Sequence, residues 1–111
     1  MSKKRIYIAT PVNARKEKTF EEKKRMAACR VEFLKMILHE DFPDAELLTS
    51  FDVCPLDEKI NECVAMGRCI AHLLTADAIY LDHAWQSSKG CNLEYRAAKI
   101  YDKQIMEHDK M

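Results

Sequence analysis

The chain has 111 residues, enough for one domain with one hydrophobic core and too few for two. Its formal net charge is +0, so no strong electrostatic field favours nucleic acid or an acidic membrane as a partner. No apolar run approaches the length of a membrane span. We therefore expect a single domain, residues 1–111, that binds neither nucleic acid nor membrane.

The cysteines and the N-terminus point to a reducing compartment. The chain has 5 cysteines, an odd number, and none form a Cys-x-x-Cys pair, which argues against a zinc site. The basic start, Met-Ser-Lys-Lys-Arg, leads into an apolar strand and not into a signal-peptide core. These features predict a cytoplasmic protein without a metal, whose thiols are reduced and mostly serve as small core hydrophobes.

The first third of the chain predicts a strand followed by a helix. Arg5–Ala9 is short and apolar, as in a buried strand. Thr19 and Glu22 have the spacing of a capping box and begin a helix. That helix is expected to end near His39, before the break at Pro43. Apolar residues at helical spacing predict its buried face: Ala27, Val31, Leu34 and Leu38, widened by Phe33 and Ile37.

A second strand and a second helix follow. The strand is expected over Ala45–Thr49, and the helix roughly from Glu58 to Leu74, introduced by Pro55 and Asp57. This helix is apolar on two faces, so either the sheet covers most of it or another subunit covers the second face. One stripe comprises Ile60, Cys63, Val64, Gly67, Ala71 and Leu74, and the other comprises Met66, Cys69, Ile70 and Leu73.

The last third predicts strand, helix and strand. Asp77–Leu81 is the third strand, a helix ends near Tyr101, and Gln104–Glu107 is a short fourth strand. Strands that alternate with helices predict an α/β fold in three layers, a parallel sheet with helices on both faces. The expected inner stripe of the last helix is Leu93, Ala97, Ile100 and Tyr101.

A polar turn, Ser87–Glu94, links the third strand to the last helix. In open α/β sheets ligands bind at this edge, and the N–H groups of a helix start attract anions. Ser88 would either cap the helix or donate its hydroxyl to a ligand, and Gly90 would let a ligand approach the backbone. Glu94 is expected roughly one turn into the helix, exposed at the mouth of the site. The helix dipole alone would also favour a glutamate there, so the turn is either an anion site or a structural cap.

Two segments resemble a known family. The first is Ile6–Pro11, and the second is Thr75–Leu81 followed by Ser88-x-Gly90-x-x-x-Glu94-Tyr95-x-x-Ala98. They resemble the nucleoside 2-deoxyribosyltransferase superfamily, which includes deoxynucleoside 5′-monophosphate N-glycosidases, and the resemblance runs from Lys4 to about Met106. It implies a flavodoxin-like sheet of about four strands in the order 2-1-3-4.

The resemblance also implies an activity: N-glycosidic bond cleavage or 2-deoxyribosyl transfer on a nucleoside or nucleoside 5′-monophosphate. Glu94 matches the family nucleophile, because a carboxylate can attack or stabilise an oxocarbenium-like sugar. Tyr7 resembles the tyrosine that holds this carboxylate, although a core aromatic fits equally well. Asp77 matches a recurrent position and either takes part in catalysis or only caps or salt-bridges. No cofactor is expected, since the chain lacks the Gly-x-Gly-x-x-Gly of a flavin or dinucleotide protein.

The remaining candidates would bind the substrate. The leaving base needs a proton, for which Asp52, Asp77, Asp82 and His83 are candidates near strand ends. Trp85 would either stack on the base or cover the core. The substrate-binding set is Ser88, Gly90, Lys89, Thr10, Pro11, Asn13, Asp52 and Trp85.

The chain departs from the family pattern in two places. Cys69 stands eight residues before Asp77, where family enzymes commonly carry an aspartate, and a thiol cannot replace a carboxylate. Pro11 and Asn13 replace the serine and arginine that the monophosphate glycosidases offer to phosphate. Of the family's phosphate-binding residues mainly Ser88 is kept, and Arg15 and Lys89 are candidates to replace the others.

The alternative function is therefore a non-catalytic module that binds a nucleotide or sugar phosphate. For either function we expect a homo-oligomer, most simply a C2 dimer. The reasons are the doubly apolar second helix and the family's habit of completing a site from a neighbouring subunit.

Overall fold

The computed structural model describes residues 3–11, 19–54 and 61–110. Its centre is a four-stranded parallel sheet in the order β2-β1-β3-β4, which confirms the predicted order 2-1-3-4. The strands are β1 (Arg5–Ala9), β2 (Glu46–Thr49), β3 (Ala78–Leu81) and β4 (Gln104–Glu107).

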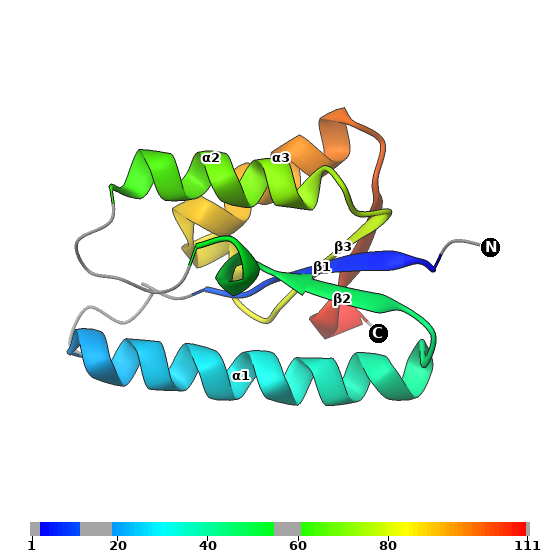
Figure 1. Cartoon of the computed structure of the whole chain (residues 1–111), viewed down its shortest axis with the longest axis horizontal. Coiled ribbons are helices and arrows are strands. Elements are labelled where there is room, and N and C mark those ends of the chain that lie inside the picture. Colours follow the sequence, from blue (N-terminus) through cyan, green and yellow to red (C-terminus); the bar gives the residue numbers. More distant parts are fainter. Residues whose placement is uncertain (1–2, 12–18, 55–60, 111) are drawn as a thin grey trace.

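Helices cover both faces of the sheet, as predicted for an α/β fold (Figure 1). The helix α1 (Phe20–Asp41) lies on one face, and α2 (Glu62–Leu73) and α3 (Lys89–Ile100) lie on the other. Three short 3-10 turns, η1 (Ser50–Asp52), η2 (Trp85–Ser87) and η3 (His108–Lys110), follow β2, β3 and β4. In the described part of the chain, no helix has both the length and the apolarity needed to cross a membrane.

Alternation along β1 divides the core into two halves, because successive side chains of a strand point to opposite faces. Ile6 and Ile8 pack with Leu34 and Leu38 on the α1 side. Tyr7 and Ala9 face α2 and α3, in a cluster that also contains Leu48, Leu73, Ile79, Leu81, Trp85, Cys91 and Ala98. Tyr7 is thereby aimed at the layer that carries Glu94.

The N-cap predicted for α1 is confirmed. Thr19 is the N-cap and accepts a hydrogen bond from the Glu22 N–H at 3.2 Å. The helix continues to Asp41, two residues past the expected end at His39. Its buried stripe is as predicted, but Phe33 does not widen it, since Phe33 is 47% exposed and its ring lies 5.2 Å from the Arg30 guanidinium carbon.

The start of α2 corrects the expected boundary. Asn61 is the N-cap, and its side chain accepts hydrogen bonds from the N–H groups of Cys63 and Val64, so the helix begins at Glu62 and not at Glu58. Pro55, Asp57, Glu58 and Ile60 lie outside the described residues. Cys69 and Leu73 of the second stripe are buried, whereas Cys63, Val64, Gly67 and Ala71 of the first stripe are exposed.

The predicted inner face of α3 is wrong except at Ala97, which packs against the core. Leu93, Ile100 and Tyr101 are exposed, and the buried residues of the helix are Cys91, Glu94 and Ala98. Both faces of this helix carry apolar side chains, so periodicity alone did not identify the inner one. The rotation of α3 turns Glu94 inward, toward Tyr7.

Candidate active site

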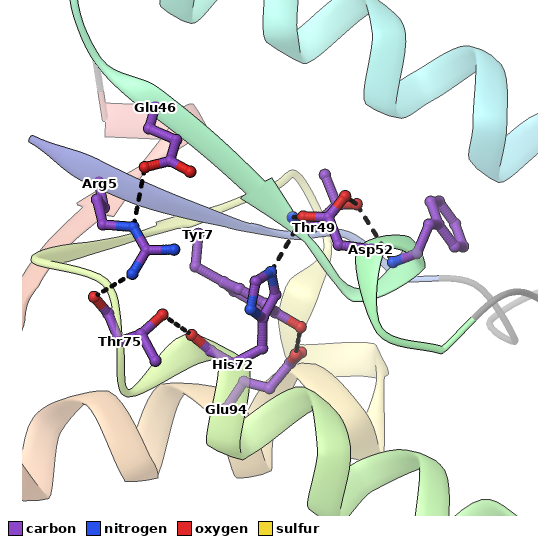
Figure 2. A network of polar contacts seen from close by, with 9 residues as sticks. Arg5, Tyr7, Glu46, Thr49, Asp52, His72, Thr75 and Glu94 are labelled. Atoms are coloured by element: carbon purple, nitrogen blue, oxygen red, sulfur yellow. Dashed lines mark hydrogen bonds and ion pairs between the residues drawn. The ribbon is translucent and has the colours of Figure 1, made fainter. Parts of the chain in front are cut away.

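The centre of the candidate site is a buried pair formed by Tyr7 of β1 and Glu94 of α3. The Tyr7 hydroxyl donates a hydrogen bond to the Glu94 carboxylate (Figure 2). Tyr7 is fully buried, and Glu94 is only 6% exposed. The structure therefore brings together the two residues that the resemblance assigned as nucleophile and holder, and it corrects the expectation that Glu94 would be exposed.

Burial changes the acidity of both groups. It raises the pKa of Glu94 from 4.5 to about 7, against the hydrogen bond from Tyr7, which lowers it. Burial and the Glu94 charge together raise the pKa of Tyr7 far above its ordinary value, so the phenol stays protonated and donates. Near neutral pH both the protonated and the ionised carboxyl group are therefore populated, which is typical of catalytic carboxylates in apolar sites.

Cys69 of α2 lies beside this pair, since its thiol interacts with the Tyr7 hydroxyl and with the Glu94 charge. Burial, and then Glu94, raise the pKa of Cys69 to about 11. Cys91 of α3 is also near Glu94, and burial is the main cause that raises its pKa to about 12. The carboxylate is therefore bordered by neutral thiols at neutral pH.

His72 is the site residue that the sequence analysis did not find. Its Nε2 lies 3.0 Å from the Asp52 Oδ2, and its ring stands edge-on to Tyr7, with 6.1 Å between ring centroids (Figure 2). The Thr49 N–H donates to the same Asp52 oxygen at 2.9 Å. Burial alone would raise the pKa of Asp52, but the Thr49 N–H and His72 outweigh burial and lower it.

A sequence signal for His72 existed. It follows Cys69 by three residues, and residues three apart share a face of a helix. Asp52, predicted as a substrate ligand at the end of the second strand, joins the same group through His72. Asp52, His72, Tyr7 and Glu94 thus form one chain of contacts from the edge of β2 to α3.

The start of α3 has structural reasons for its residues. Ser88 is the N-cap and accepts a hydrogen bond from the Cys91 N–H at 3.2 Å. A Cβ at Gly90 would lie 3.2 Å from the Met66 sulfur, so glycine allows α2 to approach α3 closely. Lys89 is exposed at the first helical position. The close approach at Gly90 is made by a helix of this chain and not by a ligand.

Trp85 and Asp77 each have a structural role in the fold. Trp85 belongs to the core, is only 9% exposed, and has its ring centre 4.7 Å from that of Tyr95. Of the two roles considered for Trp85, this is the one that covers the core. Asp77 precedes β3 at the amino-terminal edge of the sheet, where its carboxylate accepts the Arg5 N–H at 2.8 Å. The structure gives Asp77 the capping role and does not bring it to Glu94.

Thr10 and Asp82 meet on the α1 side of the sheet. The Thr10 hydroxyl donates to Asp82 at 2.6 Å, and the Arg30 guanidinium donates to both carboxylate oxygens at 2.6 and 2.9 Å. Burial would raise the pKa of Asp82, but these bonds and the His83 N–H outweigh it and lower the pKa. Asp82 is therefore an ionised structural anchor and not a proton donor for the leaving base.

Thr10, Pro11 and Asp82 also line a cavity of about 890 Å³, on the opposite side of the sheet from Glu94. Asn13, predicted as a further ligand of the first loop, lies outside the described residues. Within ranges 3–11, 19–54 and 61–110, no group of three or more His, Cys, Asp and Glu side chains is placed to hold a metal ion.

Comparison with known proteins places the chain in a family. No curated protein shows significant similarity to the chain. The model of a protein family described as a domain of unknown function, DUF4406, matches residues 4–107, which is nearly the whole sequence. The chain therefore belongs to the DUF4406 family.

Proposed function

We propose that this protein cleaves the N-glycosidic bond of a nucleoside or nucleoside 5′-monophosphate, or transfers its 2-deoxyribosyl group, with Glu94 as the nucleophile. The observation that carries the proposal is the buried Tyr7–Glu94 pair, a carboxylate oriented by a phenol that cannot itself ionise at neutral pH. The resemblance of Ile6–Pro11 and Ser88–Ala98 to the nucleoside 2-deoxyribosyltransferase superfamily supports the same assignment.

The proposed reaction has two displacements. The ionised Glu94 attacks the anomeric carbon, the bond to the base breaks, and the base leaves with the electron pair. Water or a second base then attacks the same anomeric carbon, and its bond to Glu94 breaks so that the carboxylate leaves. The attacking group gives its proton to His72, which restores the site and completes hydrolysis or transfer. The leaving base needs a proton, and His72 is the proposed donor because Asp52 holds its ring against Tyr7.

The alternative is a non-catalytic module that binds a nucleotide or sugar phosphate. Cys69 favours it, because the thiol beside Glu94 stays neutral at pH 7 where the related enzymes carry an aspartate. The raised pKa of Glu94 also means that part of the population carries a protonated carboxyl group at that pH, and a protonated carboxyl group is a poor nucleophile.

Release of free base distinguishes the two functions. The protein is incubated with nucleosides, deoxynucleosides and their 5′-monophosphates, with and without a second base, and the products are separated by chromatography. We expect free base from at least one donor, and a new nucleoside when a second base is present if the enzyme transfers. Tight binding of one donor without release of base from any of them would support the binding module.

Ser88 tests whether the start of α3 reads phosphate. We expect Ser88→Ala to weaken binding of the 5′-monophosphate roughly tenfold and to leave the affinity for the nucleoside unchanged. The reason is that the hydroxyl adds a hydrogen-bond donor to a helix start that attracts anions. The cap lost with Ser88 should also cost about 1 kcal/mol of unfolding free energy. The affinities are measured by titration calorimetry and the unfolding free energy by scanning calorimetry.

Ser87→Ala is the matched control, because the Ser87 hydroxyl donates to the Ala84 carbonyl at 2.7 Å and lies outside the cap. The control should bind both compounds as the wild type does. Equal affinities for nucleoside and monophosphate, unchanged by Ser88→Ala, would leave Ser88 as a structural cap only.

We propose that the exposed apolar side chains of α2 and α3 form the contact of a C2 dimer. Val64, Leu93, Ile100 and Tyr101 are all exposed in the single chain, and Ile100 is 74% exposed. Ile100→Glu should raise the dimer dissociation constant at least about a hundredfold, because it removes apolar burial and places like charges together across a two-fold axis. Light scattering at micromolar concentrations measures the mass.

Met36→Glu on α1 is the control, since Met36 is 68% exposed and α1 lies on the other face of the sheet. It should remain dimeric. A wild-type protein that is monomeric throughout the micromolar range would contradict the dimer.

A further inference from the structure

The cavity lined by Thr10, Pro11 and Asp82 lies where this topology opens toward ligands. Its volume is about 890 Å³, and its walls include Thr10 after β1, His83 after β3 and the Met26 side of α1. The chain leaves β1 toward α1 and leaves β3 toward α3, on opposite faces of the sheet. A crevice forms at the carboxyl ends of two such strands, which is the usual ligand position in open α/β sheets.

A hydrogen-bonded polar cluster centred on Asp82 lines this cavity. Asp82 is 3% exposed and accepts the Arg30 fork, the Thr10 hydroxyl and the His83 N–H. The guanidinium of Arg30, fixed in this way, lies 5.2 Å from the centre of the Phe33 ring. Arg30 and Phe33 both line the cavity, with the guanidinium over the face of the phenyl ring, and groups of both kinds stack on planar rings. We call this pair the Arg30–Phe33 surface.

The cavity wall carries positive charge in addition to the charged groups that pair with one another. Arg30 pairs with Asp82, and the His83 Nδ1 lies 2.9 Å from Asp109, so both carboxylates that line the cavity are engaged. Lys23 and Arg25 of α1 add two further cations to the lining. An anionic group would be attracted to this part of the wall.

We propose that this cavity binds a small organic anion that combines a flat ring with a phosphate or carboxylate. The ring would lie on the Arg30–Phe33 surface beside Met26, and the anionic group would face Lys23 and Arg25. A volume of about 890 Å³ falls within the usual range of small-molecule sites. The site is separate from Glu94, and its ligand need not contain an N-glycosidic bond.

The test uses phenyl phosphate, with phenol and inorganic phosphate as its two halves, in ¹H–¹⁵N spectra and calorimetry of the whole chain. Phenyl phosphate should shift the amides of α1 around Met26 to Phe33 and those of Asp82 and His83. It should bind at least roughly tenfold more tightly than either half, because ring and anion are recognised together. Phenylacetate, the anion of phenylacetic acid, replaces the phosphate with a carboxylate and tests that arm of the proposal.

Variants of the cavity wall distinguish binding at this site from non-specific attraction of phenyl phosphate to positive charge. Lys23→Gln with Arg25→Gln should weaken phenyl phosphate binding at least roughly tenfold, while Arg68→Gln with Arg96→Gln, equal in charge on α2 and α3, should not. Glu94→Gln should bind phenyl phosphate normally even if it abolishes base release. Shifts centred on α2 and α3, equal weakening by both double variants, or loss of binding in Glu94→Gln would each overturn the proposal.

Discussion

Glu94→Gln should lower the rate of base release by about three orders of magnitude or more, because an amide cannot attack the anomeric carbon. The variant should stay folded, since the amide oxygen has the position and the acceptor capacity of the carboxylate and still accepts the Tyr7 hydroxyl. The rate is measured by chromatography under saturating donor, and folding by circular dichroism.

Glu32→Gln is the matched control, a change of the same type at a 74% exposed side chain on α1. It should leave the rate unchanged. A Glu94→Gln protein with undiminished turnover would remove Glu94 as the nucleophile, while a protein inactive in both wild type and variant would return the question to the binding module.

The second large effect is on stability as a function of pH. The pKa of Glu94 is about 7 in the folded chain, against 4.5 for an ordinary glutamate, so between these values the folded state holds a proton that the unfolded state has lost. Stability from this group is therefore greatest at low pH and falls as the pH rises through the window from 4.5 to about 7. The loss should be on the order of 3 kcal/mol.

The measurement is urea unfolding of wild type and Glu94→Gln at intervals from pH 5 to pH 8. The free energy of unfolding of the wild type should fall relative to that of Glu94→Gln across this range. Asp52 and Asp82 have lowered pKa values, so their own contributions change in more acidic solution and cancel in the difference. Glu32→Gln should show a constant difference from wild type; a constant difference for Glu94→Gln as well would mean that the carboxyl group is ionised throughout.

The raised pKa also connects stability to function. If the ionised form of Glu94 is the nucleophile, the rate should rise with pH through the same region in which stability falls, since ionisation activates the carboxylate and costs burial energy. The pH dependence of the rate and the pH dependence of the unfolding free energy thus both report on the ionisation of Glu94.

The sequence by itself determined the order and identity of the elements. Alternation of short apolar runs with amphipathic stretches predicted Arg5–Ala9 and Gln104–Glu107 with the bounds that the structure has, and the buried stripe of α1 around Leu34. These features are local, because capping groups and apolar spacing act within one element. The spacing from Ser88 to Glu94 likewise marked the start of α3 from local chemistry.

Only the tertiary structure decided which face of each later helix is covered. In α3 the apolar residues Leu93 and Ile100 have good helical spacing, yet packing against the sheet and α2 turns Cys91, Glu94 and Ala98 inward. The same packing joins His72, Asp52 and Tyr7, which lie in different elements. Burial and hydrogen bonding across elements set the acidity of Glu94, and no local pattern contains that information, because desolvation depends on what the rest of the fold places around the carboxylate.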